Sequence, residues 1–137
     1  MLIRIMPLLI LAMVLIVPVS GQEKENPLFT EVKANLKDPT KRFTMIVSVK
    51  VKADAGAKLE AAFAKARVET LKEKGCLVYE MNRDAKAGDE YIVYERWQNL
   101  AALDFHLKAA HTQTLLTTIG DLLVGPPSVK VYIPAGE

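Results

Sequence analysis

The stretch from Gly75 to Leu116, GCLVYEMNRDAKAGDEYIVYERWQNLAALDFHLKAAHTQTLL, decides the fold of this 137-residue chain. Its first part holds two runs rich in β-branched and aromatic residues, Cys76 to Arg83 and Tyr91 to Trp97. The polar segment between them contains Gly88, which is typical of a turn. Two such runs on either side of a short turn predict a β-hairpin.

A broken helical segment follows the hairpin. Asn99 stands where an N-cap belongs, and leucines recur at helical spacing after it. The pattern weakens after Lys108, and a second helical segment is predicted from about Thr112 to Val124. Gly125-Pro126-Pro127 ends that segment, and the residues from Val129 to Ile133 predict a last strand.

One strand and one helix are predicted upstream of this stretch. Apolar and polar residues alternate from Phe43 to Val51, which indicates a strand with one apolar face. A helix follows from about Ala57 to Lys74, with Gly75 as its C-terminal stop. The order βαββαβ predicts an α+β, ferredoxin-like fold with a four-stranded antiparallel sheet and helices on one face.

Four short motifs in this region carry a family resemblance. They are Gly-Cys-Leu-x-Tyr-Glu from Gly75, Tyr-Glu-Arg-Trp from Tyr94, Ala-Leu-x-x-His-Leu from Ala102 and His-x-x-x-Leu-Leu from His111. Together they resemble the antibiotic biosynthesis monooxygenase (ABM) family, and the resemblance runs from about Phe43 to Ile133. It implies a dimeric α+β barrel. Some members of that family oxygenate phenols and quinols without metal or flavin.

Both faces of the predicted sheet carry apolar residues. If Asn82 pairs with Ile92, one face collects Leu77, Tyr79, Met81, Val93 and Trp97 together with Glu95. The opposite face collects Val78, Ile92 and Tyr94, with Glu80 and Arg96 as near neighbours. The helices cover only one face, so the other is expected to bind a partner. The simplest partner is a second copy of the chain, and the resemblance implies the same homodimer.

The N-terminus has the pattern of a secretory signal peptide. Arg4 supplies a positive start, residues 5–17 are almost wholly apolar, and Val19-Ser20-Gly21 offers a cleavage site. We therefore expect residues 1–21 to be removed and the protein to be secreted or periplasmic, with no stable membrane insertion afterwards. The alternative is an uncleaved leader that anchors the protein in a membrane.

Residues 22–42 form a charged extension before the ABM-like domain, which is expected at residues 43–134. Three apolar residues at four-residue intervals favour a short amphipathic helix in this extension: Leu28, Val32 and Leu36. A disordered linker is the alternative.

The composition excludes several classes of site. A formal net charge of +2 without a basic cluster argues against a nucleic-acid partner. The single cysteine, Cys76, excludes an internal disulfide. His106 and His111 are five residues apart, a spacing that does not align two metal ligands on a continuous helix. No phosphate-binding glycine loop is present, so neither a metal nor a cofactor is predicted.

What remains is a set of aromatic residues and histidines, expected where the sheet meets the broken helix: Phe63, Tyr79, Tyr94, Trp97, Phe105, His106 and His111. Histidine is the usual base near neutral pH. We expect Trp97, His106 and His111 to line one apolar pocket. His111 ranks first as the base, because the start of a helix keeps an imidazole neutral. The other aromatic residues would hold the substrate ring by stacking or hydrogen bonding.

A structural reading stands beside each functional one. Trp97 at a strand end is also a natural core anchor, and His106 on a helix face can be satisfied by a carbonyl or water. Two functions therefore remain: a cofactor-free monooxygenase of a small quinol-like or phenol-like aromatic, and a non-catalytic dimeric module that binds such a molecule. The haem-degrading branch fits poorly, because the first strand lacks the asparagine which that branch uses.

Overall fold

The computed structural model describes residues 24–136. The elements in chain order are α1 (Pro27–Asn35), β1 (Phe43–Lys50), α2 (Gly56–Thr70), β2 (Cys76–Arg83), β3 (Glu90–Trp97), α3 (Leu100–Lys108), α4 (Ala110–Gly120) and β4 (Ser128–Tyr132). The predicted leader, residues 1–21, lies outside the described residues. Within the part described, no helix is long and apolar enough to cross a membrane.

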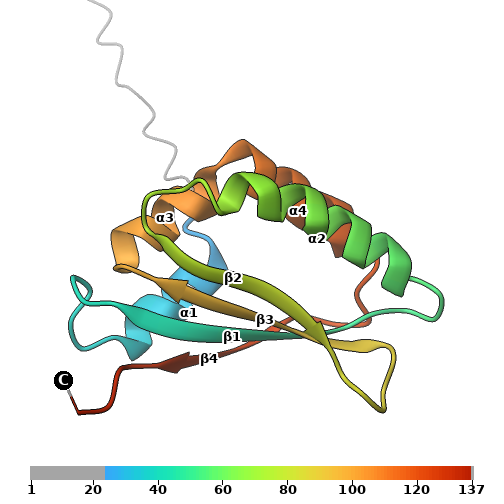
Figure 1. The fold of residues 1–137 in the computed structure, drawn as a ribbon, viewed down its shortest axis with the longest axis horizontal. Coiled ribbons are helices and arrows are strands. Elements are labelled where there is room, and N and C mark those ends of the chain that lie inside the picture. The colour runs from blue at the N-terminus through green and yellow to red at the C-terminus, as the bar shows by residue number, and fades with distance from the viewer. Residues whose placement is uncertain (1–23, 137) are drawn as a thin grey trace, which may run out of the picture.

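The four strands form one antiparallel sheet in the order β2-β3-β1-β4. Helices α2, α3 and α4 lie together over one face of this sheet, and no described helix lies over the other (Figure 1). The α+β, ferredoxin-like prediction is confirmed. The core between the layers is built from the inward residues of β1 and the apolar sides of the helices.

The register of the hairpin is as predicted, since Asn82 pairs with Ile92 and Tyr79 with Glu95. A β-bulge between Cys76 and Val78 interrupts the pairing at the start of β2. Because of this extra residue, the side chain of Leu77 is turned outward and is 48% exposed. The prediction that Leu77 shares the inner face was therefore wrong.

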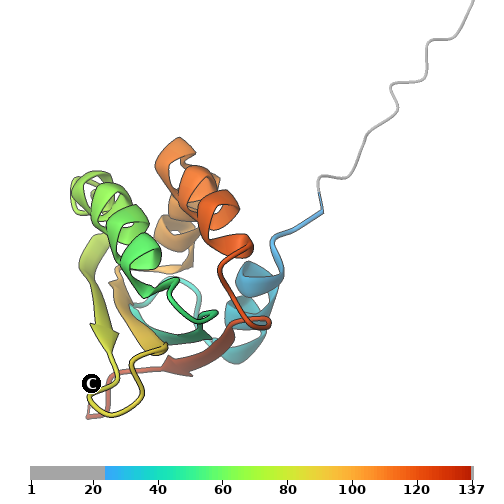
Figure 2. The ribbon, with the colours of Figure 1, turned by 90° about the vertical axis from the view of Figure 1, so that its right-hand side faces the viewer.

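The helix predicted in the charged extension is present as α1. Asn26 caps it by accepting a hydrogen bond from the Leu28 backbone N–H at 2.9 Å, and Pro27 occupies its first turn. The helix lies beside the β4 edge of the sheet, below α3 and α4 (Figure 2). Val32 is fully buried there, so α1 packs as part of the domain.

Helix α2 ends at Thr70, four residues before the predicted end at Lys74. The residues that follow form a turn that leads to Gly75. A Cβ atom at Gly75 would lie 2.2 Å from the Cβ of Ala102, so only glycine allows this turn to approach α3 so closely. The approach carries Glu73 towards α3.

The break in the last helix is confirmed. Ala109 is extended (φ −65°, ψ 142°) and separates α3 from α4. The side-chain amide of Gln113 donates a hydrogen bond to the Leu107 carbonyl, one of the acceptors that the break releases. Asn99 caps α3, as predicted, by accepting from the Ala102 backbone N–H at 2.9 Å.

Candidate functional site

The turn after α2, helix α3 and the first turn of α4 each contribute one side chain to a buried polar cluster. Oε1 of Glu73 lies 3.0 Å from Nδ1 of His106 and 2.6 Å from Nε2 of His111. The side chains of Glu73 and His106 are 5% and 3% exposed, and that of His111 is 21% exposed. A buried carboxylate needs such donors, and here both come from imidazoles.

The contact with Glu73 bears on which ring nitrogen of His106 carries the proton and on the pKa of the ring. If Nδ1 carries the proton and donates it to Glu73, Nε2 keeps a lone pair. The Oγ1 atom of Thr112 lies beside the same ring, 3.2 Å from Nδ1 and 3.5 Å from Nε2. Burial lowers the pKa of His106, which Glu73 partly opposes by stabilising the charged ring. The net lowering favours a neutral imidazole, the form that can accept a proton.

Aromatic rings from α2 and the sheet surround this imidazole. Phe63 stacks on Tyr79 with ring centroids 4.9 Å apart, and Tyr79 meets His106 edge-on at 5.2 Å. Trp97 lies 4.6 Å from His106, measured between centroids, and is fully buried. Burial also raises the pKa of the Tyr79 phenol, which therefore stays protonated. The rings hold His106 in one orientation and exclude water from its surroundings.

A second carboxyl group lies on the inner face of β3. Glu95 is buried, and its Oε2 atom accepts a hydrogen bond from Nε1 of Trp97 at 2.9 Å. Burial raises its pKa to about 7, with a smaller rise from the charge of Glu73, while the Trp97 hydrogen bond opposes both. Near neutral pH this group therefore exchanges a proton readily.

These side chains border an apolar pocket of about 80 Å³ between the sheet and the helices. His106 and Thr112 reach it from the helical layer, and Tyr79 and Glu95 reach it from the sheet. Its remaining lining residues are mostly aliphatic, and Leu28 of α1 is one of them. Few polar groups in an apolar pocket are the usual composition of a small-molecule site.

The structure does not bring all the predicted site residues to this pocket. Trp97 lies behind His106 as a core residue. His111 lies on the far side of Glu73, in a surface groove of about 520 Å³ that Phe105 also lines. Phe105 is 64% exposed. The expectation that Trp97, His106 and His111 line one pocket was wrong, because the break at Ala109 turns His111 towards the groove.

Tyr94 lies on the other face of the sheet. Its hydroxyl accepts a hydrogen bond from Nη2 of Arg96 at 2.8 Å. Of the predicted residues, Phe63, Tyr79 and His106 thus meet at the pocket, whereas Tyr94 and Phe105 are remote from it.

Sequence reasoning missed the two carboxylates, Glu73 and Glu95. Glu73 falls within the predicted helix, where nothing distinguishes it from its charged neighbours. Glu95 was placed on the inner sheet face but given no role. A carboxylate among apolar residues of an inward strand face was the available signal, since such a group is rarely buried without a reason.

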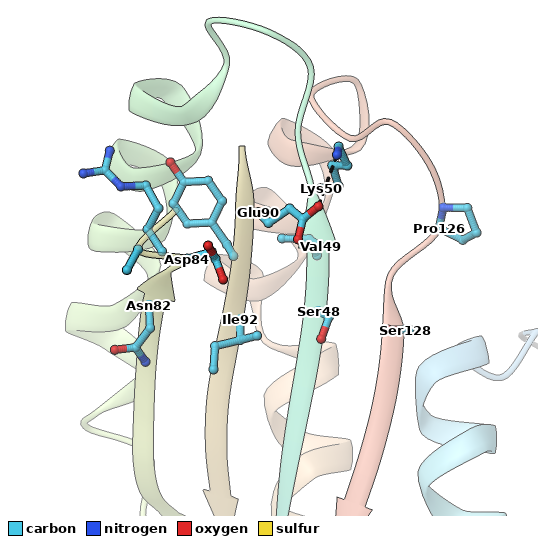
Figure 3. Close-up of a pocket in the computed structure, with 12 residues that line it drawn as sticks. Ser48, Val49, Lys50, Asn82, Asp84, Glu90, Ile92, Pro126 and Ser128 are labelled. Atoms are coloured by element: carbon cyan, nitrogen blue, oxygen red, sulfur yellow. Dashed lines mark hydrogen bonds and ion pairs between the residues drawn. The ribbon is translucent and has the colours of Figure 1, made fainter. Parts of the chain in front are cut away.

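A hollow of about 550 Å³ opens on the sheet face that the helices leave uncovered. Ser48, Ile92 and Asn82 project into it from three neighbouring strands (Figure 3). Lys50 and Glu90 form an exposed ion pair of 3.1 Å at its rim. Tyr91 also lines the hollow and is buried, but its hydroxyl donates a hydrogen bond to Glu60 at 2.9 Å. The hollow is thus lined by no buried carboxyl group or imidazole such as Glu95 or His106, so we do not regard it as the chemical site.

The spacing of His106 and His111 disfavours a metal only if both histidines lie on one continuous helix. The helix is broken, and Glu73 joins the histidines. The ligand atoms of Glu73, His106 and His111 all lie within 4.8 Å of one another. Among the described residues, this is the group suited to a metal ion.

Comparison with known proteins identifies relatives of this domain. The family model for antibiotic biosynthesis monooxygenases matches residues 42–117. "Putative monooxygenase Rv0793" of Mycobacterium tuberculosis is 32% identical over 84 residues, which are 61% of this chain and 82% of the relative. "Uncharacterized protein sll1783" of Synechocystis is 32% identical over 60 residues, and the chain spans only 41% of its length.

Solved structures show the same fold. A "Putative antibiotic biosynthesis monooxygenase from Nitrosomonas europaea" superposes with a TM-score of 0.68 at 20% identity and covers 74% of this chain and 97% of its own. The structure of Rv0793 gives a TM-score of 0.65 at 29% identity, and the match covers 71% of this chain and 98% of that chain. The matched region begins after α1, so this helix lies outside the family model.

Proposed function

The chain belongs to the antibiotic biosynthesis monooxygenase family, and from that premise we propose that it oxygenates a small quinol-like or phenol-like aromatic without a resident cofactor. The observation that carries the proposal is the position of His106. Its ring borders the apolar pocket, while Nδ1 is held by the buried carboxylate of Glu73. A neutral imidazole oriented by a carboxylate is a standard arrangement for a general base.

The reaction begins when Nε2 of His106 takes the phenolic proton. The resulting phenolate gives one electron to O2, and the two radicals combine to form a carbon–oxygen bond. The imidazolium returns its proton to the new peroxide. Loss of the proton on that carbon then breaks the O–O bond, so that one oxygen atom becomes a quinone carbonyl and the other leaves as water. The substrate itself supplies all the electrons.

The protein's contribution is the proton transfer and a dry environment. The aromatic rings of Phe63 and Tyr79 keep water from the anion and offer a stacking surface. Neutral Glu95 can donate a hydrogen bond to a substrate oxygen from the opposite wall. Excluding water from the pocket strengthens electrostatic interactions such as this hydrogen bond.

The size of the pocket restricts the substrate. A cavity of about 150 Å³ accommodates benzene in an engineered protein core. The present pocket of about 80 Å³ is smaller, so even a single ring requires its wall to move. We therefore expect one-ring rather than polycyclic substrates.

Oxygen uptake with a panel of one-ring quinols tests the proposal. We expect His106→Asn to lower the rate by about 10²- to 10⁴-fold, the usual contribution of a general base. His111→Asn should have a much smaller effect, because His111 faces the groove. A ligand-induced rise in melting temperature without any oxygen uptake would instead support the non-catalytic binding module.

We also propose that the protein acts outside the cytoplasm, because residues 1–21 have the pattern of a cleaved signal peptide. Intact-mass measurement on protein from the native host should give a chain that begins at Gln22. A chain that retains Met1 in the membrane fraction would indicate an anchor instead.

A further inference from the structure

We propose that Glu73, His106 and His111 form a binding site for one divalent transition-metal ion, with Zn²⁺ as a suitable probe. The three residues come from three separate elements, so their convergence depends on the tertiary fold. The inference goes beyond the proposed function, which needs no metal.

The geometry comes close to a metal site. Ligand atoms that each lie about 2.0–2.2 Å from an ion are about 3–3.5 Å apart. The Glu73 oxygen is 3.0 Å from Nδ1 of His106 and 2.6 Å from Nε2 of His111. No two of the ligand atoms are more than 4.8 Å apart. The remaining adjustment is about an ångström. His111 can make it, because its side chain is partly exposed and lies in the first turn of α4.

The donor set indicates the class of ion. Two imidazoles and one carboxylate suit zinc, iron, cobalt, nickel or copper better than calcium or magnesium, which prefer oxygen ligands. Glu73 also supplies the negative charge that a buried cation requires.

The surface groove gives the ion a route to the site. Glu73 and His111 both line it, and His111 is partly exposed, so an ion can approach the cluster from the His111 side without crossing the apolar pocket. With three protein ligands, a fourth position remains open towards the groove for water or a small anion. Three protein ligands and one open position are typical of reactive rather than purely structural zinc sites.

Metal binding and the proposed base chemistry exclude each other at His106. An ion on Nδ1 takes the position through which Glu73 orients the ring, and the remaining ring proton moves to Nε2. The imidazole then faces the pocket as a donor and cannot accept the phenolic proton. A bound ion would therefore inhibit quinol oxidation.

Direct binding measurements test the site without reference to activity. Isothermal titration of the tag-free mature chain with Zn²⁺ should give one ion per chain. Titration with Co²⁺ should give visible absorption bands of the intensity expected for a four-coordinate ion. We expect His111→Ala and Glu73→Gln each to weaken Zn²⁺ binding by more than about 100-fold, since even outer-shell changes weaken metal sites 10- to 100-fold.

The matched control is Glu69→Gln, which removes a carboxylate from the same groove but outside the cluster. It should leave Zn²⁺ binding within about twofold of the parent chain. Circular dichroism must show that each variant is folded. Absence of one-to-one binding at micromolar Zn²⁺, or binding that His111→Ala and Glu73→Gln leave unchanged, overturns the metal site. Absence of oxygen uptake in chelator-treated protein overturns only the proposed function.

Discussion

The two faces of the sheet differ in what their side chains do. Under the helices, Glu95 from the sheet lies near Glu73 and His106 from the helical layer, among buried rings. The open face carries rows of apolar and charged residues side by side, such as Glu80, Tyr94, Ile46 and Lys130 across the four strands. Polar groups are thus buried on one face and merely interspersed on the other.

The difference between the faces indicates which one suits a chemical reaction and which one suits binding to another chain. Burial shifts the pKa values of groups on the covered face, which is a property of reactive sites. The open face has no such groups, but it has half-buried apolar residues that no described helix covers. We therefore propose that catalysis belongs to the covered face and that a second copy of the chain binds the open one, as the family resemblance also implies.

The largest difference between the faces should appear in stability. Trp97→Ala on the covered face removes a fully buried indole and should cost about 3–5 kcal/mol of unfolding free energy. Tyr94→Ala on the open face should cost less than about 1 kcal/mol in the monomer. Urea denaturation at several protein concentrations measures both. A larger Tyr94 effect must grow with concentration, since it would then come from the dimer.

The next effect is the pH dependence that Glu95 gives the fold. Its pKa is about 7 in the folded chain against 4.5 in the unfolded chain, so the unfolded chain loses the proton first. The contribution of Glu95 to stability is therefore fully present below pH 4.5 and is lost as pH rises through 7, a change of about 3 kcal/mol in total. His106, whose pKa is lowered, acts in the opposite sense.

Glu95→Gln isolates this contribution. The unfolding free energy of the variant minus that of the parent should become more positive from pH 5 to pH 8, because only the parent loses the contribution of Glu95. The measurement is made with a chelator present. Glu80→Gln, on the open face and exposed, is the matched control and should give a flat difference. If the Glu95→Gln difference is also flat, the carboxyl is not desolvated as the structure indicates.

The third effect tests the open face. Ile46→Asp places a charge at the centre of that face, between Tyr94 and Lys130. In a sheet-to-sheet dimer it should weaken association by about 50-fold or more, which is roughly 2 kcal/mol. Ala64→Asp on the exposed side of α2 is the control. Light scattering that shows the parent chain to be monomeric at micromolar concentration would refute the dimer.

The sequence predicted the fold better than the site, and the reason is physical. Alternation and caps are local, so the predicted strands lie within one or two residues of the observed ones, and Asn99 caps its helix as expected. The position of Glu73 is not local. It depends on the close approach of Gly75 to Ala102, residues on different elements. The same holds for Leu77, whose outward direction depends on a bulge that no local pattern signals.

His111 illustrates the limit within a correct prediction. The break after Lys108 was predicted, but the direction that the break gives to His111 was not. An irregular residue such as Ala109 can turn the following helix in several directions, and packing against α2 decides among them. We therefore rank His106 above His111 as the base, which reverses the order that the sequence suggested.

The smallest effect concerns α1, which lies outside the family model and borders the pocket through Leu28. Leu28→Ala should cost only about 1–2 kcal/mol, because the side chain is partly exposed. It should also enlarge the pocket on the side where α1 closes it. We therefore expect a lower KM for substituted quinols with little change in kcat.

Phe29→Ala is the matched control for this variant. Phe29 is on the same helix and also packs against the core, but it lines a different groove, together with Asp104 and Lys108. It should destabilise α1 to a similar extent without changing substrate preference. If both variants change KM equally, α1 acts through its general stability rather than as a wall of the pocket. If neither variant changes KM, the aromatic ring of the substrate enters the pocket from another side. Helix α1 then closes the pocket less than its contacts indicate.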